Sequence, residues 1–153
     1  MSITDPTSYS PTVPAAQAGQ PYDRTGFIVD SFAAEAEIEF GAACVRGTLP
    51  EKQCNLPAAD TDLFLGVAVF SVGQEQARLD GSKYRVTDPV GVARKGRWWV
   101  RVTEAVEAGD TAYCDLSSTD IGKFCKTSSN NLATGGKFEI GADVGGLAVI
   151  DLG

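Results

Sequence analysis

Residues 63–70 of this chain read Leu-Phe-Leu-Gly-Val-Ala-Val-Phe, an apolar run interrupted by a single glycine. Side chains of a β-strand point alternately to its two faces, so a strand of this composition is apolar on both faces. Such a strand suits the middle of a fold, where other elements cover it on both sides, better than a sheet with one face in solvent. We therefore expect this segment to lie at the centre of the molecule.

Further short strand candidates follow residue 26, separated by clusters of Gly, Asp, Asn, Pro and Ser. Residues 33–39, rich in Ala and Glu, are the one stretch that suggests a helical turn, and they are short enough to be strand instead. The spacing of the segments predicts an all-β fold, a compact β-barrel or β-sandwich over residues 27–153. The candidate strands are residues 43–46, 63–71, 90–94, 98–103, 111–115, 122–126, 137–140 and 147–152.

A four-residue pattern occurs twice before these strands. Residues 38–41 and 106–109 both read as an apolar residue, Glu, a spacer and Gly, and each precedes a strand candidate. Glycine tolerates the positive φ of a sharp turn. The pattern predicts that one turn-into-strand device is used at both places.

Residues 1–26 differ from the rest of the chain in composition. They are rich in Ser, Thr, Pro, Ala and Gln, and they contain four of the chain's 7 prolines. Proline removes backbone donors and restricts its neighbours to extended conformations, so these residues are expected to form an extended N-terminal arm. Two interpretations stay open: a tail without a role, or an arm that docks on a neighbour through Ile3, Tyr9 and Tyr22. In either case, removing residues 1–19 is expected to leave the melting of the barrel nearly unchanged.

The sequence contains few of the residue types and motifs that enzymes commonly use for catalysis. It contains no histidine, which removes the commonest general base, the Ser-His and Cys-His nucleophile pairs and the usual zinc ligands. No glycine-rich phosphate loop occurs. Carboxylates at positions 35, 37 and 39, or at 60 and 62, are the remaining candidates for a hydrolase, and alternating acids are more typical of a solvated strand face. We expect a protein that is not an enzyme, with no cofactor and no metal.

Charge and hydropathy exclude two classes of partner. The formal net charge of −7 argues against nucleic acid, whose binding needs clustered Lys and Arg. No run of about 18 apolar residues occurs, so no membrane span is expected. The N-terminus also lacks the basic-then-apolar order of a secretion signal, which indicates synthesis and release in a cytoplasm.

The four cysteines form two local pairs, each bracketing a short segment that suits a hairpin. These pairs are Cys44 with Cys54 and Cys114 with Cys125, and neither has metal-ligand spacing. Two interpretations stay open: free thiols kept reduced where the protein is synthesised, or two local disulfides that form later.

Residues 94–102, Arg-Lys-Gly-Arg-Trp-Trp-Val-Arg-Val, are the most informative local segment. Alternation along a strand places Trp98 with the two valines on one face and Arg97, Trp99 and Arg101 on the other. Trp and Arg are the residues most enriched at interface hot spots, so the second face is a candidate contact patch. The alternative is that a second sheet or the chain's own arm covers Trp99, with the arginines extending around it.

Four stretches together resemble the structural cement, or capsid decoration, proteins of tailed phages. The similarity extends over most of the chain from residue 26 onward, as an order of short motifs rather than a catalytic signature. The stretches are residues 26–31, 90–100, 106–113 and 145–150. The cysteine pairs and the Trp98-Trp99 doublet are not features of the family pattern.

The resemblance implies a non-enzymatic virion protein on the outer surface of a mature capsid. Its partners would be the major capsid protein and further copies of itself, as a homotrimer or alternatively a dimer. The resemblance carries over no active site. The capsid or subunit interface is expected to include Tyr9, Tyr22, Phe27, Arg97, Trp99 and Arg101. The alternative function is a carbohydrate- or receptor-binding β-domain of a phage tail or other surface structure, gripping its ligand through Trp98, Trp99 or Tyr84.

Overall fold

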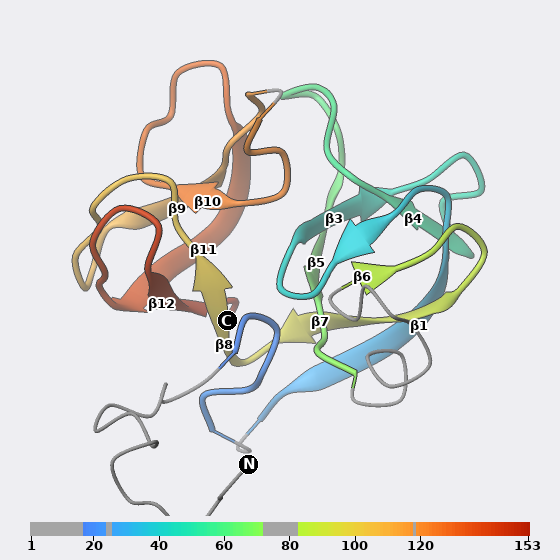
Figure 1. Cartoon of the computed structure of the whole chain (residues 1–153), viewed down its shortest axis with the longest axis horizontal. Helices are drawn as coiled ribbons and strands as arrows, with labels where there is room; N and C mark the ends of the chain where they lie inside the picture. The colour runs from blue at the N-terminus through green and yellow to red at the C-terminus, as the bar shows by residue number, and fades with distance from the viewer. Residues whose placement is uncertain (1–16, 24–25, 72–82, 118) are drawn as a thin grey trace, which may run out of the picture.

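The computed structural model describes residues 17–23, 26–71, 83–117 and 119–153. These residues form an all-β protein with two lobes side by side (Figure 1). The first lobe is a closed barrel in which the strands follow the order β1-β4-β3-β5-β7. Its strands are β1 (Ile28–Ala34), β3 (Ala43–Arg46), β4 (Gln53–Asn55), β5 (Phe64–Ala68) and β7 (Pro89–Lys95).

The second lobe is a five-stranded sheet in the order β10-β9-β11-β12-β8. A separate two-stranded sheet pairs β2 (Ile38–Glu39) with β6 (Lys83–Tyr84) beside the barrel. The strands of the larger sheet are β8 (Arg97–Arg101), β9 (Thr111–Cys114), β10 (Phe124–Cys125), β11 (Leu132–Ile140) and β12 (Leu147–Asp151). No helix in the described part of the chain is long and apolar enough to cross a membrane.

The two lobes share one topology. In the barrel, β1 pairs parallel with β4, and all the other neighbours are antiparallel. In the second lobe, a parallel bridge from Val102 to Phe124 joins the end of β8 to β10, and the remaining neighbours are again antiparallel. The orders coincide when β1 is matched with β8, β3 with β9, β4 with β10, β5 with β11 and β7 with β12. The second sheet is therefore a nearly closed copy of the barrel.

Strand β5 lies between two hydrophobic cores, as residues 63–70 predicted. Leu65 and Ala68 face the barrel interior, whereas Val67 packs with the core of the second lobe. Barrel residues Ala43 and Ala93 join Val67 in that second core, so the outer face of the barrel is covered by the other lobe. The all-β prediction is confirmed, and the lobes are fused through a continuous apolar contact.

The repeated turn predicted at residues 38–41 and 106–109 is present. Gly41 has φ +82° and Gly109 has φ +95°, each at the third position of a turn closed by an N–H···O hydrogen bond of 3.1 Å. This is the geometry of a type II turn, which requires positive φ at that position. Each turn leads into an equivalent strand, β3 in one lobe and β9 in the other. Residues 33–39 form the end of β1, a bend and β2 rather than a helical turn.

Candidate functional site

Strand β8 separates its two tryptophans in the way that the alternation predicts. Trp98 is 1% exposed and Val100 fully buried in the core of the second lobe, while Trp99 on the other face is partly exposed. The indole Nε1 of Trp98 donates a 2.9 Å hydrogen bond to the carbonyl oxygen of Lys95, so its polar atom is satisfied. Trp98 is therefore a structural residue, and Trp99 remains the candidate for contact.

The base of the N-terminal segment pairs with β8 as an added antiparallel strand. Gly19 N–H donates to the Trp99 oxygen at 2.8 Å, Trp99 N–H donates to the Gln20 oxygen at 2.9 Å, and Tyr22 N–H donates to the Arg97 oxygen at 2.8 Å. The Tyr22 ring contacts the Trp99 ring edge-on at a centroid distance of 5.8 Å. Of the two interpretations of Trp99, the structure therefore shows the chain's own N-terminal segment lying on it.

Gly19 fixes this segment to both lobes. Besides its bond to Trp99, its carbonyl oxygen accepts a 2.9 Å hydrogen bond from Phe70 N–H at the end of β5. Its φ is +87°, and a Cβ there would lie 2.7 Å from the oxygen of Ala68. The expectation that residues 1–19 can be removed without effect on melting therefore needs revision, because Gly19 is buried between the lobes.

The two arginines of the predicted patch have partners within the chain. Arg97 lies 3.7–3.9 Å from carboxylates of Asp23, Glu139 and Asp151. Arg101 donates a 3.1 Å hydrogen bond to the Gly145 oxygen and is exposed. Ion pairs at partly exposed positions contribute little stability, so Arg97 stays available at the rim of a contact.

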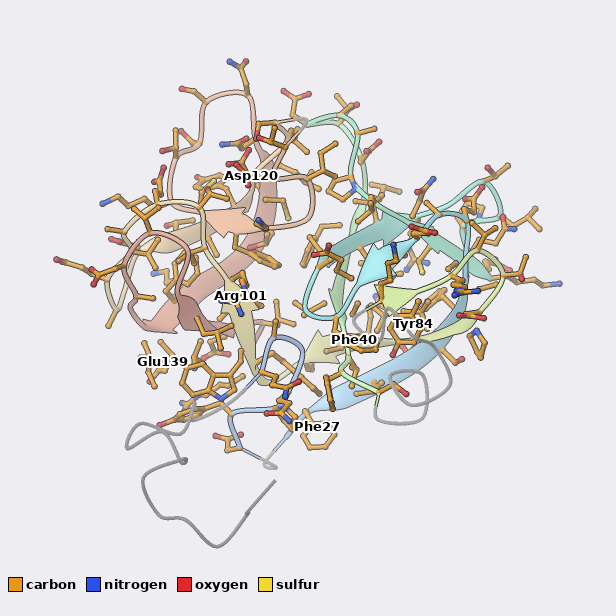
Figure 2. All side chains as sticks on the ribbon, viewed as in Figure 1. Phe27, Phe40, Tyr84, Arg101, Asp120 and Glu139 are labelled. Atoms are coloured by element: carbon orange, nitrogen blue, oxygen red, sulfur yellow. The ribbon has the colours of Figure 1, made fainter. Side chains whose placement is uncertain are left out.

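Four apolar side chains from Tyr22 to the start of β1 are exposed. Phe27 packs edge-on against Trp98 at 5.4 Å and still has 38% of its surface exposed, while Tyr22 is 43% exposed. Ile28 and Val29 are exposed as well. We call these four side chains the seam surface, because they lie where the N-terminal segment, β8 and β1 meet; Figure 2 shows Phe27 at the edge of the molecule. Tyr9 lies outside the described residues.

A groove of about 760 Å³ adjoins this seam on the side of Trp99 and Arg101. Its walls come from both lobes and from the N-terminal segment. Apolar side chains form much of its surface, and charged residues of both signs, Arg101, Lys123 and Glu39, lie beside them. Its apolar lining includes Phe40, Phe70, Trp99, Ile121 and Leu147.

Two aromatic residues of the carbohydrate-binding alternative are not available to a ligand. Trp98 and Tyr84 are 1% and 3% exposed, and the Tyr84 hydroxyl donates to the backbone oxygen of Val69. Burial raises the pKa of Tyr84 to about 12. Stacking on a sugar needs an exposed ring face, so Trp99 alone of the three could contact one.

Three of the five carboxylates considered for catalysis have structural contacts. Glu35 accepts hydrogen bonds from the backbone and hydroxyl of Thr48, and Glu37 forms an ion pair with Lys83 at 2.8 Å. Asp62 accepts from the backbone amides of residues 58 and 59. Within the described ranges, no group of three or more Cys, Asp or Glu side chains is placed to hold a metal ion.

All four cysteines are buried free thiols in the structure. Cys44 and Cys54 lie on β3 and β4, and Cys114 and Cys125 lie on the equivalent strands β9 and β10. A hydrogen bond to Cys54, together with burial, holds the pKa of Cys44 well above its usual value, and the same bond lowers the pKa of Cys54. Burial raises the pKa of Cys114, and it raises that of Cys125 to about 11.

The family model described as structural cement protein (E217 gp24/Pam3 gp6) matches residues 5–153. The chain belongs to this phage structural cement family. The resemblance inferred from the short motifs is thereby confirmed, and it places the protein in the virion capsid with a structural role.

Two solved structures show the same fold. A chain from the capsid of Myoviridae phage XM1 is similar with a TM-score of 0.78 and 18% identity, over 95% of each chain. The N base of head fiber gp8.5 from bacteriophage phi29 has a TM-score of 0.55 and 14% identity, over 83% of this chain and 94% of that one. A sequence search of curated proteins gave no match.

Proposed function

We propose that this cement protein binds the outer surface of a mature tailed-phage capsid and stabilises contacts between major capsid protein subunits, without catalysing a reaction. The observation that carries the proposal is the seam surface, where Tyr22, Phe27, Ile28 and Val29 are each 38–47% exposed and Tyr22 lies against the partly exposed Trp99. Exposed apolar side chains that gather in one region of a protein surface mark an interaction site.

The composition of this surface suits a protein contact. Aromatic side chains bring a large apolar area and few rotamers to an interface, and Arg97 and Arg101 supply donors at its border. Because Arg97 is already held near three carboxylates, it loses little freedom when a partner covers it. We expect the aromatic residues to supply most of the binding energy and the arginines to orient the partner.

Binding that favours the mature lattice would stabilise the capsid by mass action. A ligand that binds one state of an assembly and not another shifts the population toward the bound state. Contacts that are weak singly become strong when symmetry repeats them over a shell. The net charge of −7 keeps the unbound protein soluble before it docks.

The N-terminal arm is the second element of the proposal. Since residues 17–23 belong to the folded body, the arm proper is residues 1–16, and Tyr9 is its aromatic anchor. We propose that this arm docks on a neighbouring subunit. We also propose that the protein acts on the capsid as an oligomer, with a homotrimer expected before a dimer.

The direct test mixes the purified protein with undecorated, expanded capsids and measures the bound ratio by sedimentation. Tyr22→Ser should weaken binding at least several-fold with its fold unchanged. Leu63→Ser is the matched control, since Leu63 is 65% exposed and lies at the end of β5 remote from Gly19. Equal binding of both variants would remove the seam surface from the proposal, and no saturable binding by the wild type would remove the capsid role.

A further inference from the structure

Strand β1 is paired along only part of one of its edges. Along the other edge it follows β7 from Ile28 to Ala33. On the edge toward β4, the pairing covers Ala33 and Ala34 alone. The first half of β1 therefore projects past the end of β4.

The open edge carries backbone groups that point outward. Ala33 N–H donates to the Lys52 oxygen at 2.8 Å and Glu35 N–H to the Cys54 oxygen at 2.9 Å, both on the β4 side. Alternate residues of a strand direct their N–H and C=O groups to the same edge. Val29 and Ser31 therefore point to this edge too, and among the described residues no partner meets them there.

The second lobe shows what the equivalent edge binds. Strand β8 corresponds to β1, and its end bonds to β10 through Thr103 N–H and the Phe124 oxygen at 2.9 Å. Strand β10 does not extend along the rest of β8. There the backbone groups of Arg97 and Trp99 are paired with residues 19–22, Gly-Gln-Pro-Tyr. The topological match places Val29 and Ser31 where the other lobe has Arg97 and Trp99. One edge is filled by an uncharged segment, and among the described residues the corresponding edge is open.

Exposed apolar side chains surround the open edge. Ile28 and Val29, next to Phe27, are exposed on the projecting strand. Open strand edges with apolar side chains tend to pair with another chain unless they are covered. An added strand at Val29 and Ser31 would cover both the backbone groups and these side chains.

The chain supplies a segment of fitting chemistry in its arm. Residues 7–10, Thr-Ser-Tyr-Ser, are uncharged, lie between Pro6 and Pro11, and offer four consecutive N–H groups with one aromatic ring, which resembles the segment that binds β8. The arm is joined to the body at Gln17, which lies apart from the start of β1. Gln17 lies by the groove that contains Arg101, at the far end of β8, whereas β1 starts beside Trp98.

We propose that the β1 edge at Val29 and Ser31 binds the arm, residues 1–16, of a second copy of this chain by antiparallel strand addition. The proposal deepens the docking arm of the proposed function and rests on it. The binding site for the arm is then the counterpart of the edge that residues 19–22 fill, and no residue in the described part of the chain occupies it. Copies seated next to one another on a shell would thereby be linked, each giving an arm and receiving one.

A complementation experiment with two variants of the chain tests this. Ser31→Pro removes the outward N–H but keeps the arm, and Pro is tolerated on an edge strand whose N–H faces solvent. Deletion of residues 1–16 removes the arm but keeps the edge and Gly19. Ser31→Thr is the matched control for the first variant, since it keeps the N–H. Association is followed by analytical ultracentrifugation over a concentration series, with amide exchange at Val29 and Ser31 as the local readout.

The wild type and the control Ser31→Thr should self-associate. Ser31→Pro alone and the deletion of residues 1–16 alone should stay monomeric, and a mixture of these two should form a one-to-one complex. Association of Ser31→Pro equal to that of the wild type would overturn the proposal. A monomeric wild type with protected Val29 and Ser31 amides would show that the chain's own arm fills the edge. A lack of association together with rapid exchange of both amides would also overturn the proposal, because the edge would then be covered neither by the chain's own arm nor by a second copy. The capsid-binding assay is read separately, so a failure of arm docking between copies can be told apart from a failure of capsid binding.

Discussion

The amide of Gly19 lies 2.8 Å from the carbonyl oxygen of Trp99 and donates a hydrogen bond to it. Because the Gly19 oxygen also accepts from Phe70 at the end of β5, this residue connects the second lobe to the barrel. The base of the arm is thus part of the folded structure, and it holds Tyr22 over the Trp99 ring. The seam surface depends on that anchorage.

Gly19→Ala should destabilise the protein more than Gly109→Ala. Both glycines have positive φ, which costs another residue roughly 1–2 kcal/mol. A Cβ at position 19 would in addition meet backbone atoms at 2.7 Å, whereas at position 109 nothing lies within 4 Å. The two free energies of unfolding are compared by denaturant titration. Equal losses would contradict the close approach of Gly19 to both lobes.

The adjacent tryptophans should respond differently to replacement. Trp98→Ala empties a buried site and should lower the free energy of unfolding by about 3–5 kcal/mol. Trp99→Ala removes a partly exposed ring whose main neighbour is Tyr22, and it should cost less, about 1–2 kcal/mol, while weakening capsid binding. Denaturant titration of the two variants measures the loss of unfolding free energy, and sedimentation with capsids measures the loss of binding. A larger stability loss for Trp99→Ala would reverse the assigned roles.

The four cysteines should be unreactive in the native protein. All are buried, and burial raises the pKa of Cys114 and Cys125, so little reactive thiolate is accessible near neutral pH. A thiol reagent that absorbs on reaction should titrate no cysteine rapidly in the folded protein and all four after unfolding without reductant. A count of two or none after unfolding would instead indicate the local disulfides.

Ionisation of Tyr84 should weaken the fold at high pH. Its pKa is raised to about 12 by burial, compared with about 10 in an unfolded chain. The unfolded state therefore loses its proton first, so the contribution is complete below pH 10 and declines as pH rises toward 12. Tyr84→Phe should be less stable than the wild type at neutral pH because it lacks the hydrogen bond to Val69, and the difference should shrink between pH 10 and 12. A constant difference across that range would contradict the raised pKa.

The sequence predicted those parts of the fold whose side chains alternate or are continuously apolar. Residues 43–46 coincide with β3, and residues 63–71 contain β5, because burial on one or both faces leaves a clear pattern. Strands β4 and β6 were missed, since both are short and mostly polar. Strand β1 was missed as well, because its first four residues are exposed and leave no pattern of burial. Their pairing depends on neighbours that only the folded chain supplies.

The candidate site could be predicted only in part. The opposite orientations of Trp98 and Trp99 follow from strand alternation, but the pairing of residues 19–22 with β8 does not. Those contacts are made by backbone groups, which leave no pattern in side chains, and Pro21 reads as a break in any strand. The repeated turn was visible because its glycines need positive φ, and it is one sequence sign of the shared topology of the two lobes. The two local cysteine pairs, which lie on equivalent strands, are another.

The central claim is that this protein stabilises a mature capsid by binding its outer surface. Calorimetry of expanded capsids, with and without saturating protein, tests it most directly, because a ligand of the intact shell must raise the temperature at which the shell comes apart. We expect a higher disruption temperature with wild-type protein and a smaller rise with Tyr22→Ser. An unchanged disruption temperature at saturating occupancy would contradict the account.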